Sequence, residues 1–187
     1  MKVFQFFGRR PATTACLSNV PDGFMPHYAC NGLIYRTYEA LSTAPVETLW
    51  QTLINLADIS SWHPLIDSTN APRGLTAKPG LIYRVIPRWL PIPVQIFVER
   101  VSPPELISIR LLSVPGLEER VIYRLESTVW GTQISHSICL RGWLSPLAWS
   151  VLRPFAPKIA EAIARAAENT TLPALPRKKS GFGEGRV

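Results

Sequence analysis

The fold is decided by residues 94–142, which read VQIFVERVSPPELISIRLLSVPGLEERVIYRLESTVWGTQISHSICLRG. Bulky apolar and polar residues alternate through this stretch, and the runs are rich in β-branched and aromatic side chains, a pattern typical of strands with one buried face. Proline or glycine separates the runs at Pro103–Pro104, Pro115–Gly116 and Trp130–Gly131. Such turns are too short for parallel crossovers, so the stretch predicts an antiparallel meander.

The same pattern of strand-like runs separated by proline and glycine extends toward the N-terminus as far as Leu65. A separate run at residues 34–41 also alternates bulky and polar side chains and predicts a first strand. We therefore expect a sheet of about seven antiparallel strands. The six strands of the meander are expected at residues 65–71, 80–86, 94–102, 106–113, 118–128 and 132–142.

Helical periodicity occurs on either side of the meander. Ser42 or Thr43 can cap a helix over residues 46–56, and a second short turn ends at Trp62 because His63 precedes a proline. After Gly142 the apolar pattern is interrupted by prolines, and a long helix is predicted to begin near residue 157. The buried stripe of this last helix is Ile159, Ala160, Ile163, Ala166 and Ala167.

The order of elements predicts an α+β fold in which a curved seven-stranded antiparallel sheet wraps around a long C-terminal helix. Alanines form much of the buried stripe of that helix, and they are too small to fill the centre of such a sheet. We therefore expect an internal apolar cavity. The domain should span residues 33–171, between an irregular arm at 1–32 and a basic disordered tail at 172–187.

The formal net charge is +7, but residues 33–171 hold thirteen basic and eleven acidic residues and are nearly neutral. The arginines of the meander are spaced as solvent-facing strand positions, so we do not expect nucleic-acid binding. The basic run at Arg177–Lys179 is interpreted as a solvated tail, with contact to an anionic membrane as the alternative.

Three cysteines without C-x-x-C spacing argue against a disulfide framework and indicate a reducing, cytoplasmic setting. The alternative is an organelle, because residues 1–21 contain Lys2, Arg9 and Arg10 and no acid. His27, Cys30 and Cys16 are the nearest approach to a metal-ligand set, and we expect neither a metal nor a cofactor.

Four passages together resemble the helix-grip fold of the START-like (SRPBCC) superfamily, and most of all its polyketide cyclase/dehydrase and coenzyme Q-binding members. The passages are residues 44–50 with 58–64, residues 98–106, residues 131–136, and Gly142 before the last helix. Several relatives carry an acidic residue two positions after the histidine that corresponds to His136, whereas this chain has Ile138. This departure weakens the case for a charged cavity floor.

The resemblance implies binding or transport of a hydrophobic small molecule such as a quinone, a lipid or a polyketide-like compound. The alternatives are a cyclase or dehydratase with His136 as general base, and an adaptor that binds another protein through its arm or the Arg88–Pro93 loop. No phosphate loop, nucleophile elbow or paired acids on one strand are present, so the sequence favours a binder over an enzyme.

Strand alternation turns His136 and Tyr123 toward the inside of the sheet, where they can hydrogen-bond a ligand or simply pack in the core. Trp62 and His63 are expected at the open end of the cavity, and the loop that carries Trp89 is interpreted as a lid or as a membrane or partner contact. The candidate ligand-binding residues are Trp62, His63, Tyr83, Trp89, Val121, Tyr123, Ile134, His136, Ile138 and Ile163.

Overall fold

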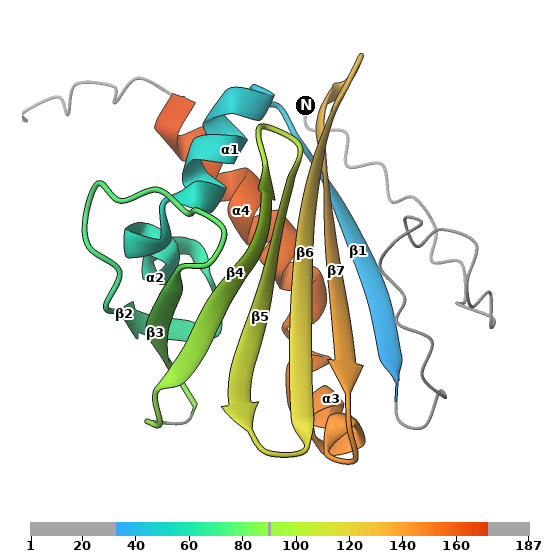
Figure 1. Ribbon diagram of the computed structural model, residues 1–187. Helices are drawn as coiled ribbons and strands as arrows, with labels where there is room; N and C mark the ends of the chain where they lie inside the picture. Colours follow the sequence, from blue (N-terminus) through green and yellow to red (C-terminus); the bar gives the residue numbers. More distant parts are fainter. Residues whose placement is uncertain (1–32, 90, 172–187) are drawn as a thin grey trace, which may run out of the picture. The chain divides into compact units, whose positions relative to one another are not determined.

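A computed structural model describes residues 33–89 and 91–171 (Figure 1). The predicted arm, the predicted tail, and the residues Cys16, His27 and Cys30 lie outside these ranges. The strands are β1 (Ile34–Ser42), β2 (Ile66–Thr69), β3 (Ile82–Pro87), β4 (Val94–Ser102), β5 (Leu106–Val114), β6 (Leu117–Thr128) and β7 (Gly131–Arg141). The helices are α1 (Val46–Ile54), the 3-10 turn η1 (Leu56–Asp58), α2 (Ile59–Trp62), α3 (Ser145–Leu152) and α4 (Ala156–Thr171).

The seven strands form one antiparallel sheet in the order β1-β7-β6-β5-β4-β3-β2. Strands β2 to β7 make the predicted meander, and β1 closes its far edge by pairing with β7 along its whole length, from Ile34 opposite Leu140 to Ser42 opposite Thr132. The chain therefore leaves β1 at one edge and reaches β2 at the other through α1 and α2. The predicted antiparallel sheet is confirmed, and β4 occupies the predicted residues.

Helix α4 packs across one face of the sheet, together with α1 (Figure 1). Its buried side chains are Ala156, Ile159, Ala160, Ile163, Ala164 and Ala167. Because most of these are alanine, the helix axis can approach the strands closely. The predicted α+β arrangement, a curved sheet gripping a long C-terminal helix, is what the structure shows.

The predicted cap of the first helix is wrong. Strand β1 continues to Ser42 and α1 begins at Val46, with Pro45 as its N-cap and no side-chain cap bond. The Ser42 hydroxyl instead donates to Glu168 Oε1 at 3.0 Å, and the Thr43 backbone N–H donates to the same oxygen at 3.0 Å. These two residues tie the end of β1 to α4 rather than initiate α1.

Helix α3 is an element that the sequence analysis did not predict. The prolines around it were interpreted as interruptions, but Pro146 stands in the first turn of the helix, where its missing N–H has no intrahelical partner to lose. Pro154 comes two residues after the helix has ended at Leu152. Both prolines are therefore compatible with a helix between them.

Gly142 sets the direction of the chain between β7 and α3. Its φ of +118° is unusual for an L-residue, and a Cβ there would overlap the carbonyl oxygen of Gly116 in the β5–β6 turn. The side chain of Trp143 packs directly over Gly116. Two glycines thus bring the β5–β6 turn against the start of α3. Among the described helices, none is long and apolar enough to cross a membrane.

Candidate functional site

The inner face of the sheet carries His136 at the middle of β7. The register places Tyr38 of β1 opposite it on one side and Tyr123 of β6 opposite it on the other. Its neighbours along the strand on the same face are Ile134 and Ile138, which are 0% and 2% exposed. His136 therefore stands between two tyrosines on a largely aliphatic face. The inward direction of His136 and Tyr123 was predicted from alternation in the sequence, and the position of Tyr38 beside them was not.

His136 is entirely buried, and neither ring nitrogen makes a hydrogen bond of ordinary geometry within the described residues. Its imidazole stacks on the Tyr123 ring, with centroids 5.0 Å apart and planes inclined by 21°. Burial lowers the pKa of His136 to about 4, and a hydrogen-bonding interaction with the Ala156 backbone acts in the opposite direction. At neutral pH the ring is uncharged, with one N–H donor and one acceptor nitrogen.

Glu119 is an inner-face residue that the sequence analysis missed. It lies on β6 with the same parity as Val121 and Tyr123, opposite Leu140 of β7. Burial raises the pKa of Glu119 to about 7, and the pKa of Tyr123 is raised by burial and by the Glu119 carboxylate. The signal was present in the sequence, since the alternation used to place Val121 inside extends two residues further to Glu119.

His63 follows α2 and lies close enough to His136 for the two rings to influence each other. Burial lowers the pKa of His63 to about 3, and His136 and Arg88 lower it further. Its Nδ1 accepts a hydrogen bond from the Leu65 backbone N–H at 3.3 Å, and its ring centroid is 5.3 Å from that of Trp62. The segment after α2 therefore directs a second neutral histidine toward the same interior.

Other polar atoms are also buried without partners among the described residues. They include Ser145 Oγ, the indole Nε1 of Trp62 and the hydroxyl of Tyr83, whose side chain is 4% exposed on β3. Val121 and Ile163 are buried with them. Nine of the ten candidate residues thus have buried or half-buried side chains, and Trp89 does not, because its side chain is 54% exposed.

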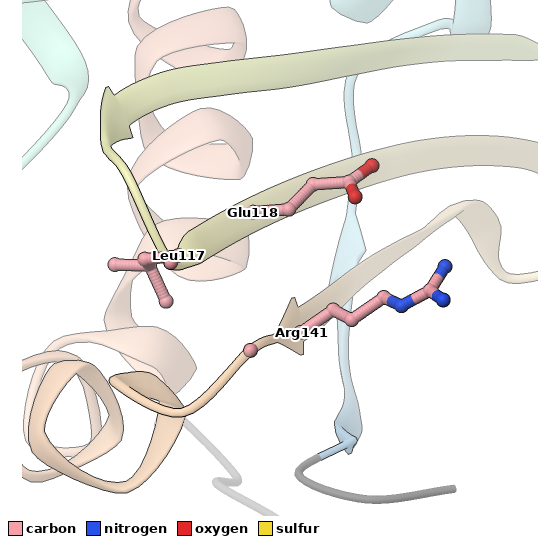
Figure 2. A pocket seen from close by; sticks show the side chains of 5 residues that line it. Leu117, Glu118 and Arg141 are labelled. Carbon is pink, nitrogen blue, oxygen red and sulfur yellow. The ribbon is translucent and has the colours of Figure 1, made fainter. Parts of the chain in front are cut away.

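The space around His136 is closely packed, since the side chain has no accessible surface. One depression lies on the outside, between the β5–β6 turn and the end of β7 (Figure 2). Glu118 and Arg141 extend along its side, and Gly116, Leu117 and Gly142 complete its lining. An internal cavity stays a prediction. The described residues contain no cluster of three side chains suited to a metal ion.

Solved structures share this arrangement of sheet and helices. A protein from Mesorhizobium loti, MLL2253, is 18% identical with a TM-score of 0.62, and the match covers 74% of this chain and 100% of that one. The chain has the START-like helix-grip fold. Within that fold, Ara h 8.0201 is 16% identical with a TM-score of 0.59 over 74% and 99% of the two chains.

An aromatase/cyclase from a Streptomyces species, ZhuI, also has the START-like fold. It is 13% identical to this chain with a TM-score of 0.62, and the match covers 76% of this chain and 98% of the other. No protein-family model matches the chain, and no curated protein sequence is similar enough to match. At these identities the likeness concerns the fold, and the chemistry has to be argued from the residues themselves.

Proposed function

We propose that this START-like domain binds a hydrophobic small molecule, such as a quinone, a lipid or a polyketide-like aromatic, between the sheet and α4. The observation that carries the proposal is His136, whose ring nitrogens are buried in a largely apolar interior, make no hydrogen bond of ordinary geometry among the described residues, and have only the Ala156 backbone as an interacting polar group. A buried polar group that lacks a partner costs about 1–3 kcal/mol. A ligand with one oxygen placed against the imidazole removes that cost.

Three further groups have the positions needed to orient such a ligand. The Tyr83 hydroxyl and the Trp62 indole N–H are buried and unpartnered, and Tyr123 stacks on His136. Apolar burial, at about 25 cal/mol per Å², would supply most of the affinity, and these few polar atoms would select the orientation. The expected ligand is therefore largely apolar, with hydrogen-bonding oxygen atoms.

The interior is packed in the structure, so the ligand has to displace side chains as it enters. The segment of α2 is the element best placed to move, because it is a single short helix and its Trp62 and His63 are half-buried. Opening at α2 would expose His136 without breaking the pairing of β6 with β7. This expectation matches the role of Trp62 and His63 predicted from the sequence.

Catalysis is the second candidate, and its support is the fold shared with an aromatase/cyclase. A general base at His136 would need a carboxylate or another group to orient the imidazole and a pKa near neutrality. No side chain of the described residues hydrogen-bonds the imidazole, and burial lowers the pKa of His136 to about 4. The local chemistry therefore favours binding over proton abstraction.

The test is to purify the chain under native conditions and identify co-purified small molecules by mass spectrometry of an organic extract. We expect the wild type to carry an apolar molecule at close to one per chain. We expect His136→Leu to lose most of it while melting at the same or a higher temperature, because leucine removes the orphaned nitrogens and keeps most of the volume.

Tyr123→Phe is the second variant, since it deletes the hydroxyl alone and leaves the stacked ring. Ser135→Ala is the matched control, because Ser135 lies beside His136 on β7 with its side chain on the other face. Binding to the wild type that is unchanged in His136→Leu would refute the proposed site. A wild type that is empty and shows no thermal shift with quinones, lipids or aromatic polyketides would refute the function and favour the adaptor hypothesis.

A further inference from the structure

One end of the sheet, which we call the α3 end, gathers exposed apolar side chains from segments far apart in the sequence. The registers pair Ile34 with Leu140, Glu118 with Arg141 and Gln95 with Leu112, so the β3–β4 turn, the β5–β6 turn, the end of β7 and α3 all lie at this one end of the sheet (Figure 1). Four large apolar side chains at this end are more than half exposed: Trp89 at 54%, Ile92 at 57%, Trp143 at 77% and Leu147 at 65%.

Basic side chains surround these apolar groups. The guanidinium of Arg36 lies over the ring of Trp149 on α3, 6.0 Å from its centroid. Arg153 and Lys158 are exposed at the junction of α3 and α4. Arg88 precedes Trp89 and donates to the backbone oxygens of Ile66 and Ser60 at 3.0 and 3.2 Å.

These four cations form no ion pair with a carboxylate of the described residues. The acid nearest the tip of β6, Glu118, is already engaged by Arg110 and Arg120, at 3.5 and 3.7 Å. The α3 end is therefore positively charged as well as apolar. The near-neutral balance of the whole domain conceals this local excess.

The opposite end of the sheet offers an internal comparison. It also exposes apolar groups, with Val129 and Trp130 at 92% and 80% on the β6–β7 turn. The charges beside them are different, because Glu168 binds the end of β1 and Glu126 lies on β6 next to the turn. At the α3 end, exposed apolar groups coincide with cations that form no ion pair among the described residues, while toward the opposite end Arg73, Lys78 and Arg100 are exposed as well.

We propose that the α3 end docks the domain on an anionic lipid bilayer. The apolar groups stand on separate turns and on a short helix, so they can enter an interface side by side without a preformed groove. Tryptophan and leucine favour the boundary between headgroups and acyl chains, and each lysine or arginine near an anionic surface adds a favourable contact. Arg36, Arg88, Arg153 and Lys158 would then face lipid phosphates.

Docking at this end would also bring the proposed ligand-binding interior close to the bilayer. This link between docking and ligand exchange rests on the proposed function. Glu119 lies two residues from the start of β6, and His63 lies beside Arg88, so both inner-face groups are near the α3 end. A ligand exchanged between bilayer and interior would travel a short distance at this end. The docking itself does not require the ligand.

The test measures sedimentation of the full chain with vesicles of phosphatidylcholine alone and of phosphatidylcholine with 30% phosphatidylglycerol. We expect binding to the anionic vesicles, weakened by 0.5 M salt because exposed charges are then screened. We expect the double variant Arg153→Gln and Lys158→Gln to bind at least tenfold more weakly, since each cation is worth about fivefold in affinity.

Apolar insertion is tested with Leu147→Ser combined with Ile92→Ser, and with Trp143→Ser. Trp130→Ser is the matched control, because it removes an equally exposed tryptophan from the opposite end. We expect the first two variants to lose at least fivefold in affinity and the control to bind like wild type. Because Trp143 packs over Gly116, the melting temperature of Trp143→Ser is measured first. If Trp143→Ser is unfolded, the result of the Leu147→Ser and Ile92→Ser double variant decides the test of apolar insertion.

Three outcomes would overturn the proposal. They are no binding of wild type to anionic vesicles, equal losses in the α3-end variants and in Trp130→Ser, and concentration-dependent dimerisation that the α3-end variants abolish. The last would assign the surface to a second copy of the chain. A failure of docking leaves the extracted ligand of the wild type unchanged, so it is distinguishable from a failure of the proposed function.

Discussion

At the scale of single residues, the interior holds groups whose charged forms are disfavoured by burial. His136 and His63 both have pKa values lowered well below 6.5, and Glu119 has a raised pKa. All three therefore favour their neutral forms more than they would in water. A neutral interior suits an uncharged ligand, and it makes the stability of the domain depend on pH in two opposite directions.

Glu119→Gln tests the acid side of this dependence. The pKa of Glu119 is raised from 4.5 to about 7 in the folded state, so the folded chain keeps a proton that the unfolded chain loses between these values. Stability should fall as pH rises through this window, and Gln should abolish that part of the fall. We expect the variant to gain stability relative to wild type from pH 4.5 to 7 and to stay ahead above it.

Urea unfolding at a series of pH values measures this difference. The two histidines contribute stability that is lost as pH falls below 6.5, but they do so equally in both proteins and cancel in the comparison. A gap between variant and wild type that does not change with pH would contradict the placement of Glu119 on the buried face.

At the scale of elements, the path of the chain from β7 into α3 is set by the backbone conformation and close backbone packing of two glycines. Gly116 and Gly142 both have positive φ, and Trp143 covers Gly116. The close approach of the β5–β6 turn to Gly142 leaves no room for a methyl group. The geometry of this junction orients α3, and with it the exposed Leu147 and the cation Arg153.

Gly142→Ala should therefore be much more destabilising than Gly80→Ala. Both glycines have positive φ, but an added Cβ at Gly80 meets nothing within 4 Å, whereas at Gly142 it meets a backbone oxygen. We expect Gly80→Ala to cost about 1 kcal/mol from backbone strain and Gly142→Ala to cost about 3 kcal/mol or more, because strain and overlap combine. Equal costs in denaturant unfolding would show that the close approach is absent.

At the scale of the whole molecule, long-range ion pairing organises the outer face. Glu99, at a bulge in β4, pairs with Arg110 of β5 and with Arg120 of β6, the latter at 2.8 Å. The sequence analysis interpreted the arginines as separate solvent-facing positions, but two of them are half-buried around one carboxylate.

Domain limits are also a property of the whole molecule, and residues 33–171 remain our predicted domain. The sheet, α1 and α4 bury a continuous core made within this range. We expect a chain of residues 33–171 to unfold cooperatively within about 2 °C of the full chain, because its core is complete. Removing α4 as well should abolish cooperative unfolding, and a loss above about 5 °C for residues 33–171 would contradict the limits.

The sequence by itself determined the strands, their antiparallel order, the long last helix and the inward direction of Tyr123 and His136. These follow from periodicity, which is local and survives in a linear chain. Helix α3 was missed for a local reason too, because prolines at its two ends were interpreted as breaks rather than as boundaries.

Only the tertiary structure decided which residues meet. That His63 approaches His136, and that Trp89 lies outside with Trp143 and Leu147, depends on how far the sheet curves and where α2 and α3 come to rest. Burial and charge pairing arise from this packing of distant segments, so the pKa of an inner carboxyl and the unpaired cations of one end have no signature in the spacing of residues along the chain.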